Sequence, residues 1–159
     1  MIPIGGDQAS YVLKQAVMKH LDIRKIPYVD LGCYDMEMTN YNIFADRVCR
    51  LMLKENLERG IVLCGSGLGI GMAANRYPGI RCGRCDSSIQ VKMARRENDM
   101  NVLSMGGRIV GPETAADMVD AFLDTEFDEA YRNNVMQCEE LDRRLYRQEF
   151  LNRIGSGAN

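Results

Sequence analysis

Residues 60–71 read Gly-Ile-Val-Leu-Cys-Gly-Ser-Gly-Leu-Gly-Ile-Gly, an apolar run that ends in a thiol and continues as alternating glycines. The unbroken apolar run over 60–64 is typical of a strand that is buried on both faces of a parallel sheet. Glycine-rich turns from a strand into a helix often hold anions, because their bare amides and the helix N-terminus carry partial positive charge. The stretch therefore predicts a buried strand, an anion-binding loop and a short helix through residues 73–75.

The same alternation of short apolar runs and longer amphipathic patterns continues on both sides of this stretch. Asn40 is a suitable N-cap for one of the helices, and Pro112 suits the first turn of another. Since parallel strands need helical crossovers of this length, we expect an α/β fold. It is one Rossmann-like domain over residues 1–159, a five-stranded parallel sheet with helices on both faces. Strands are predicted over 2–5, 28–31, 60–64, 80–85 and 102–105, and helices over 11–21, 43–56, 87–96 and 112–122.

A polar, charge-rich helix is predicted near the end of the chain, from about residue 133 to 153. Its apolar stripe is too extended to pack on one small sheet. We therefore expect residues 132–154 to form a dimerisation helix that packs on a partner subunit, in a homodimer or a dimer of dimers, and residues 155–159 to be a frayed tail. The stripe consists of Val135, Cys138, Leu141, Leu145, Phe150 and Ile154.

The composition limits the classes of function. The chain has 159 residues, enough for one domain with a substantial core, and a formal net charge of −2. This balance gives no sign of nucleic-acid or anionic-membrane binding, and no segment approaches the roughly 20 apolar residues that span a bilayer. Without a secretory signal, the six cysteines are expected to be reduced thiols of a cytoplasmic protein. Cys82 and Cys85 have redox or zinc spacing but no second pair, which favours buried structural thiols and no metal site.

Ligands of parallel α/β sheets bind beyond the carboxyl ends of the strands. The predicted strands end at Gly6-Asp7-Gln8, at Cys64 and its loop, at Asp86 and at Gly106-Gly107. A thiol at a strand end that faces backbone amides is biased toward the thiolate and could act as a base near neutral pH, although core packing is the alternative for a single cysteine. Nucleotide binding is disfavoured, because the glycine spacing is tighter than the dinucleotide fingerprint and no lysine follows as in a P-loop.

Three segments resemble the family of type B ribose-5-phosphate isomerases and galactose-6-phosphate isomerases. The resemblance runs in order from the first strand to about Phe127 and is most specific in the second segment. It implies an enzyme without a metal or cofactor, which interconverts the aldose and ketose forms of a phosphorylated sugar through a cis-enediolate. The segments are 5–9 (Gly-Gly-Asp-Gln-Ala), 64–81 (Cys-Gly-Ser-Gly-Leu-Gly-Ile-Gly-Met-Ala-Ala-Asn-Arg-Tyr-Pro-Gly-Ile-Arg) and 101–111 (Asn-Val-Leu-Ser-Met-Gly-Gly-Arg-Ile-Val-Gly).

The resemblance also implies roles for individual residues. Cys64 would be the base that moves a proton between C1 and C2 of the sugar, and Ser66, in the place of a usual threonine, would assist proton transfer at the oxygens. Asp7 would contact substrate hydroxyls, and Tyr41 lies in a segment similar to the family's Thr-Asp-Tyr. The other residues implied in substrate binding are the backbone amides of Gly65, Gly67, Leu68 and Gly69, together with Gln8, Asn98 and, for the phosphate, Arg132.

Two histidines of the family pattern are missing. Gln8 stands in place of one, and Glu97 in place of the other, which in the family opens the cyclic sugar by proton transfer to the ring oxygen. A second phosphate-binding arginine is also missing, since Met136 occupies its position. A four-carbon sugar with phosphate on its terminal oxygen cannot close a five-membered ring. The substrate is therefore expected to be a tetrulose 4-phosphate, or a pentose or hexose phosphate whose ring Glu97 or water opens.

Two other classes of function stay open. The chain could be a non-catalytic partner, because galactose-6-phosphate isomerase is built from two related subunits of which one lacks the thiol. The presence of Cys64 argues against that interpretation. Alternatively, the glycine loop could bind a nucleotide or phosphate ligand without catalysis. Deuterium exchange from solvent into a candidate sugar distinguishes an isomerase from both.

Overall fold

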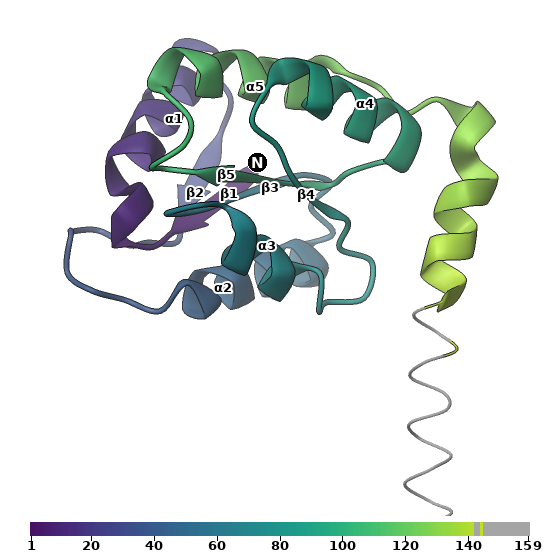
Figure 1. Ribbon diagram of the computed structural model, residues 1–159, viewed down its shortest axis with the longest axis horizontal. Coiled ribbons are helices and arrows are strands. Elements are labelled where there is room, and N and C mark those ends of the chain that lie inside the picture. Colours follow the sequence, from purple (N-terminus) through teal and green to yellow (C-terminus); the bar gives the residue numbers. More distant parts are fainter. Residues whose placement is uncertain (142–143, 145–159) are drawn as a thin grey trace, which may run out of the picture.

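A five-stranded parallel sheet forms the centre of the computed structural model, which describes residues 1–141 and 144 (Figure 1). The strands lie in the order β2-β1-β3-β5-β4, and every neighbouring pair is parallel. The predicted α/β fold with its five-stranded parallel sheet is therefore confirmed. The strands are β1 (Ile2–Gly6), β2 (Tyr28–Asp30), β3 (Gly60–Cys64), β4 (Cys82–Arg84) and β5 (Val102–Gly106).

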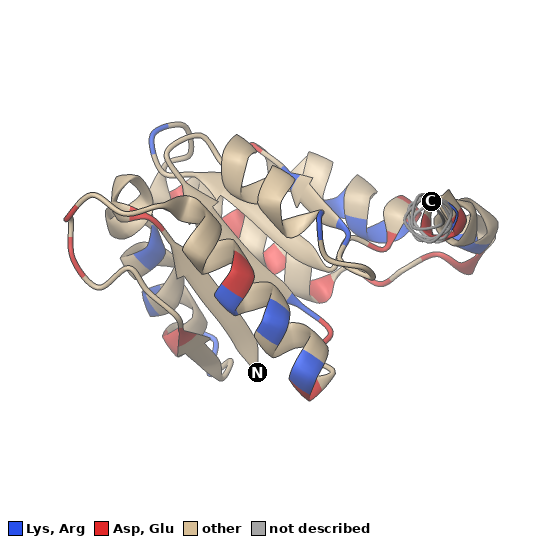
Figure 2. Cartoon of the chain, turned by 90° about the horizontal axis from the view of Figure 1, so that it is seen from below, with Lys and Arg blue, Asp and Glu red and all other residues tan. Residues whose placement is uncertain are grey.

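Helices cover both faces of this sheet, as the alternation along the chain predicted (Figure 1). Two further 3-10 helices, η1 (Gln8–Ser10) and η2 (Glu129–Tyr131), lie in the connections. Both signs of charge are distributed over the helices and loops (Figure 2). One layer contains α1 (Tyr11–Ile23), α4 (Ser88–Asn98) and α5 (Pro112–Asp124), and the other contains α2 (Tyr41–Glu55) and α3 (Leu68–Ala74).

The central strand β3 divides its side chains between two apolar clusters. Successive side chains of a strand point to opposite faces of the sheet. Ile61 and Leu63 therefore pack in the cluster that includes α1, α4 and α5, whereas Val62 and Cys64 pack in the cluster of α2 and α3. All five residues of β3 are buried, which fixes the position of the thiol at the end of the strand.

Several boundaries differ from the predicted ones for identifiable reasons. The Asn40 side chain accepts a hydrogen bond from the Asn42 amide at 3.0 Å, so that α2 begins at residue 41 and not at 43. Strand β4 is shorter than predicted, because side chains take the amides that a longer ladder would use. The Arg81 amide donates to Asn101 Oδ1 and the Cys82 amide to Asn75 Oδ1, each at 2.7 Å.

The C-terminal helix begins as predicted, and residues 132–141 are helical. It extends away from the sheet at the β4 side of the molecule (Figure 1). Within the stripe, Leu141 is 59% exposed. Leu145, Phe150 and Ile154, together with the predicted tail at 155–159, lie outside the described residues. Over residues 1–141 and 144, no helix has the length and apolar character that a bilayer crossing requires.

Candidate active site

The thiol of Cys64 lies where the direction of the strand order reverses. From β1 the chain goes to β2 at one side and then returns to β3 at the other side. In parallel α/β sheets, a ligand crevice forms at such a reversal, beyond the carboxyl ends of the strands. Asp7 directly follows β1, and its amide donates to the Leu63 carbonyl at 3.2 Å. The two strand ends that carry Asp7 and Cys64 are thus adjacent.

The glycine loop turns back over the thiol. The Gly67 amide donates to Cys64 Sγ at 3.1 Å, and the Cys64 side chain is buried. Gly67 has φ of 77°, and a Cβ on it would lie 2.9 Å from the Met105 carbonyl carbon. Since an L side chain rarely adopts this φ, glycine is required where the loop makes its closest approach to β5. The Leu68 amide donates to Ser66 Oγ at 3.3 Å, which brings the hydroxyl to the same turn.

The outer side of this turn is held by two side chains from neighbouring strands. Arg84 Nε, at the end of β4, donates to the Ser66 carbonyl oxygen at 3.1 Å, and its guanidinium is ion-paired with Asp86. The fully buried Ser104 hydroxyl, on β5, donates to the Gly67 carbonyl oxygen at 2.6 Å. The carbonyls of the turn therefore point away from the thiol and are engaged, while its Gly67 amide points toward the thiol.

Asp7 is nearly buried at the turn from β1 into η1. Its Oδ1 accepts from the Ala9 amide at 3.0 Å. Burial raises the pKa of Asp7 above its ordinary value, although hydrogen bonds from Ala9 and Ser10 and the charge of Arg108 act in the opposite direction. The carboxylate is thus held in a partly desolvated position next to the end of β3.

Gln8 is hydrogen-bonded to the segment that carries Tyr41 over the glycine loop. Gln8 Oε1 accepts two hydrogen bonds from Thr39, from the backbone amide at 2.9 Å and from the hydroxyl at 3.0 Å. Since a backbone N–H can only donate, the oxygen of the Gln8 side chain is the atom that faces Thr39. Two residues later, the Tyr41 ring lies over the loop, with Cζ 2.7 Å from where a Cβ on Gly69 would lie.

Arg108 is a residue of this site that sequence reasoning missed. It follows β5, its amide donates to the Gly65 carbonyl at 3.0 Å, and the preceding Gly107 amide donates to the Cys64 carbonyl at 2.8 Å. The Arg108 Nε lies 3.5 Å from where a Cβ on Gly65 would be, so the guanidinium stem runs along the loop. The signal was present in the sequence, because Gly-Gly-Arg follows a strand whose carboxyl end was already marked as a ligand position.

Glu97, Asn98 and Arg132 do not join Cys64 within one chain. Helix α4 starts after β4 at the carboxyl edge of the sheet and ends before β5 at the amino edge, so its last turn is at the edge opposite the thiol. There Glu97 pairs with Arg96 at 2.8 Å, and Arg132 is ion-paired with Glu129.

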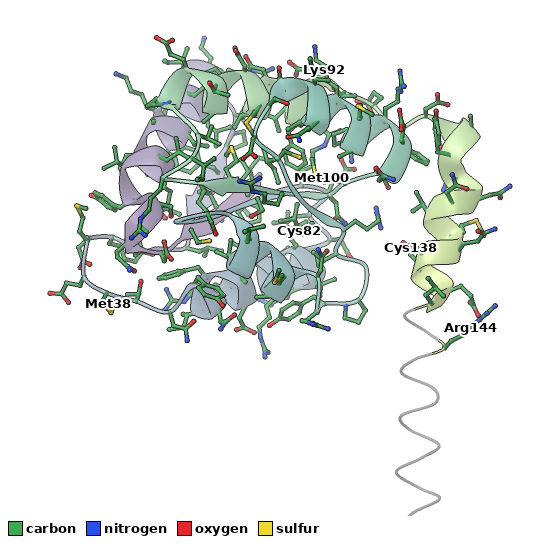
Figure 3. All side chains as sticks on the ribbon, in the orientation of Figure 1. Met38, Cys82, Lys92, Met100, Cys138 and Arg144 are labelled. Carbon is green, nitrogen blue, oxygen red and sulfur yellow. The ribbon has the colours of Figure 1, made fainter. Side chains whose placement is uncertain are left out.

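A cavity of about 490 Å³ at this opposite edge lies between the body of the domain and the C-terminal helix. Asn98, Cys82, Met100 and Cys138 are among its lining residues. In Figure 3, Cys82 and Met100 lie on the body and Cys138 on the helix. Cys85 is buried, and burial raises the pKa of its thiol to about 11, as expected of a structural cysteine. Among residues 1–141 and 144, no group of three or more His, Cys, Asp or Glu side chains could hold a metal ion.

Comparisons with known proteins give concordant results. Residues 2–137 match the model of the ribose/galactose isomerase family. Ribose-5-phosphate isomerase B of Escherichia coli is 35% identical over 127 residues, which cover 80% of this chain and 85% of that protein. D-erythrulose-4-phosphate isomerase of Pectobacterium atrosepticum is 34% identical over 129 residues, which cover 80% of this chain and 84% of that protein. A ribose-5-phosphate isomerase B structure from Clostridium thermocellum superposes with a TM-score of 0.87 at 36% identity, covering 91% of this chain and 98% of that one.

Proposed function

The chain belongs to the ribose/galactose isomerase family and is a sugar-phosphate isomerase, and on this premise we propose that Cys64 is its catalytic base. The observation that carries the proposal is the contact between Cys64 Sγ and the Gly67 amide at 3.1 Å, at the carboxyl ends of β1 and β3, where the strand order reverses. A thiolate that accepts a hydrogen bond from a backbone N–H is stabilised, and it is then available to remove a proton from carbon.

The proposed reaction runs through an enediolate. In the aldose-to-ketose direction, the Cys64 thiolate removes the proton from C2, the C2–H electron pair forms the C1–C2 double bond, and the carbonyl pair moves to O1. The Ser66 hydroxyl, which lies at the same turn, passes the O2 proton to O1. The thiol then returns its proton to C1, and the carbonyl forms at C2. No atom is gained or lost, and the thiolate is regenerated.

The glycine loop supplies the electrostatic part of this mechanism. Charge develops on the sugar oxygens in the enediolate, and the amides of Gly65, Leu68 and Gly69 are the proposed donors to it. The Gly67 amide, which the resemblance placed in the same group, donates to Cys64 Sγ instead. Preorganised donors of this kind contribute about 3 to 4 kcal/mol each to lowering a barrier. Asp7 is the proposed partner of substrate hydroxyls, and Arg108 is a cation that extends along the loop at Gly65.

We propose that a second copy of the chain supplies Glu97, Asn98 and Arg132. Within one chain these residues are at the opposite edge of the sheet, next to the cavity beside the C-terminal helix. Coexpressed copies that carry Cys64→Ala and Arg132→Ala separately test this arrangement. Half of the dimers are mixed and have one intact site of two, so activity recovers to about a quarter of wild type. No recovery above that of the single variants would exclude shared sites.

The proposed substrate is an open-chain four-carbon sugar phosphate, a tetrulose 4-phosphate and its aldose. The sequence supports this assignment, because Glu97 stands where the family has its ring-opening histidine and an open-chain sugar needs no ring-opening acid. Gln8 can offer only its NH₂ group to a sugar oxygen, since its carbonyl oxygen already accepts two hydrogen bonds from Thr39. The sequence identities to a ribose-5-phosphate isomerase and to an erythrulose-4-phosphate isomerase are nearly equal, at 35% and 34%, so an assay distinguishes the five-carbon from the four-carbon substrate.

Turnover of erythrulose 4-phosphate and of ribulose 5-phosphate, measured side by side on the purified protein, tests the proposed substrate. We expect kcat/KM to be higher for the four-carbon sugar. Glu97→Gln should change that value little, because an open-chain substrate needs no ring-opening acid. Faster turnover of the five-carbon sugar, abolished by Glu97→Gln, would contradict the proposal. A non-catalytic subunit would turn over neither sugar.

A further inference from the structure

We propose that Arg84 is a positioning residue that activates Cys64 through the peptide bond between Ser66 and Gly67. Arg84 lies at the end of β4 and does not contact the thiol itself. Its Nε donates to the carbonyl oxygen of Ser66 at 3.1 Å, and the N–H of the same peptide group, on Gly67, donates to Cys64 Sγ at 3.1 Å. The inference rests on the proposed role of Cys64 as base.

The peptide group transmits the charge because its electrons are delocalised. A cation that hydrogen-bonds to the carbonyl oxygen draws electron density from the C–N bond, and the N–H on the other side becomes a stronger donor. The Gly67 N–H is buried, so its contact with sulfur is not screened by water. The expected result is a sulfur atom that holds negative charge more readily when Arg84 is present.

The neighbouring peptide group keeps this arrangement rigid. The Ser104 hydroxyl is fully buried and donates to the Gly67 carbonyl oxygen at 2.6 Å. The Arg84 stem packs on the same turn, since its Cγ lies 3.2 Å from where a Cβ on Gly67 would be. Arg84 thus holds the Ser66 carbonyl of this peptide group and Ser104 holds the carbonyl of the next one, so the Gly67 N–H cannot rotate away from Cys64 without breaking these contacts.

Asp86 moderates the charge of Arg84. Its Oδ2 is ion-paired with the Arg84 guanidinium, and its backbone amide donates to Gln90 Oε1 at 2.8 Å. Other charged groups at this edge include Asp7 after β1, Asp30 at the end of β2 with its partner Lys14, and Arg108 after β5. The Tyr41 ring covers Gly69. Removing the Asp86 charge should therefore leave the effect of Arg84 on the Ser66 carbonyl at least as strong. Removing the Arg84 charge should weaken the hydrogen bond from the Gly67 N–H to Cys64 Sγ.

Two substitutions with opposite expectations separate this role from a structural ion pair. Arg84→Met keeps an unbranched apolar stem on Gly67 and removes the Nε donor and the charge. We expect kcat to fall about tenfold, equivalent to about 1.4 kcal/mol in the barrier, with KM changed less than about twofold. Asp86→Asn should not lower kcat, and Arg84→Lys, which keeps the charge but not the Nε donor, should recover part of the loss.

An equal fall of kcat in Arg84→Met and Asp86→Asn would overturn the inference, because it would show that only the ion pair matters. A rise of KM without a change in kcat in Arg84→Met would also overturn it, since that result describes lost substrate binding.

The reactivity of the thiol gives a readout that needs no sugar. Iodoacetamide labelling at pH 7, followed by mass spectrometry of the peptides, reports Cys64 separately from the other cysteines. The labelling rate of Cys64 in the wild-type protein, at equal protein concentration, is the reference. We expect Arg84→Met to slow labelling of Cys64 about tenfold relative to the wild type, and Asp86→Asn not to slow it.

The two proposals can fail independently. If the wild-type protein labels rapidly at Cys64 and slowly in Arg84→Met, yet isomerises no sugar phosphate, the Arg84 relay stands and the proposed function fails. Unchanged Cys64 labelling in Arg84→Met would overturn the relay, whatever the activity of the enzyme. Thermal unfolding of each variant confirms that the comparison is between folded proteins.

Discussion

The substitution Gly67→Ala tests the backbone geometry on which the site depends. Two costs add at this position. The φ of 77° is a left-handed conformation, which costs an L residue about 1 to 2 kcal/mol. A Cβ would also lie 2.9 Å from the Met105 carbonyl carbon and 3.1 Å from the Gly106 nitrogen, and overpacking of this kind costs about 1 to 3 kcal/mol. The free energy of unfolding should therefore fall by about 2 to 5 kcal/mol.

Gly79 provides a matched control for the conformational cost alone. Its φ is 80°, almost the same as that of Gly67, but a Cβ on it would have no atom within 4 Å. Gly79→Ala should therefore lose only about 1 to 2 kcal/mol. Urea unfolding followed by far-UV circular dichroism, at one fixed protein concentration, gives both values. Equal losses in the two variants would refute the close approach of the loop to β5.

Three further outcomes are expected. Thr39→Val should lose one of the two hydrogen bonds to Gln8, worth about 0.5 to 1.5 kcal/mol, and should raise KM more than it lowers kcat in steady-state assays. Asp7→Asn should stabilise the protein near neutral pH, because burial raises the pKa of Asp7 in the folded state. Urea titrations should show this gain falling as the pH drops through the folded-state pKa and vanishing below 3.8, where Asp7 is protonated in both the folded and the unfolded protein. Asp30→Ala should cost about 3 to 5 kcal/mol in urea unfolding, more than Lys14→Met, because it leaves the fully buried Lys14 ammonium without its partner at 2.5 Å; a smaller loss than in Lys14→Met would contradict this.

Local sequence patterns were sufficient to predict the existence of the strands and of the glycine loop. The boundaries of β3 were predicted without error, because its apolar run and the following glycines are local signals. Strand β4 was predicted too long at its start, since the side chains of Asn101 and Asn75 accept from the amides of Arg81 and Cys82, and the pattern of apolar residues does not reveal these contacts. Helix α2 began two residues early because its cap at Asn40 needs no intervening turn.

Contacts between residues far apart in the chain could not be predicted from the sequence. Gln8 meets Thr39 across 31 positions, and Arg84 meets Ser66 across 18, and neither pairing follows from residue type or spacing. The location of Glu97, in contrast, follows from topology alone. A helix that leads into a parallel strand ends at the amino edge of the sheet, so the predicted elements already implied that Glu97 and Cys64 belong to opposite edges of one chain.

Proton exchange at the sugar carbon tests the central claim, that Cys64 moves a proton between C1 and C2. The wild-type protein and Cys64→Ala are incubated in D₂O with erythrulose 4-phosphate and, separately, with ribulose 5-phosphate, and proton NMR follows the C1 hydrogens of the ketose. We predict that the wild-type protein incorporates deuterium at C1 of at least one sugar and that Cys64→Ala incorporates none above the rate without enzyme. Incorporation by Cys64→Ala at the wild-type rate would contradict the account.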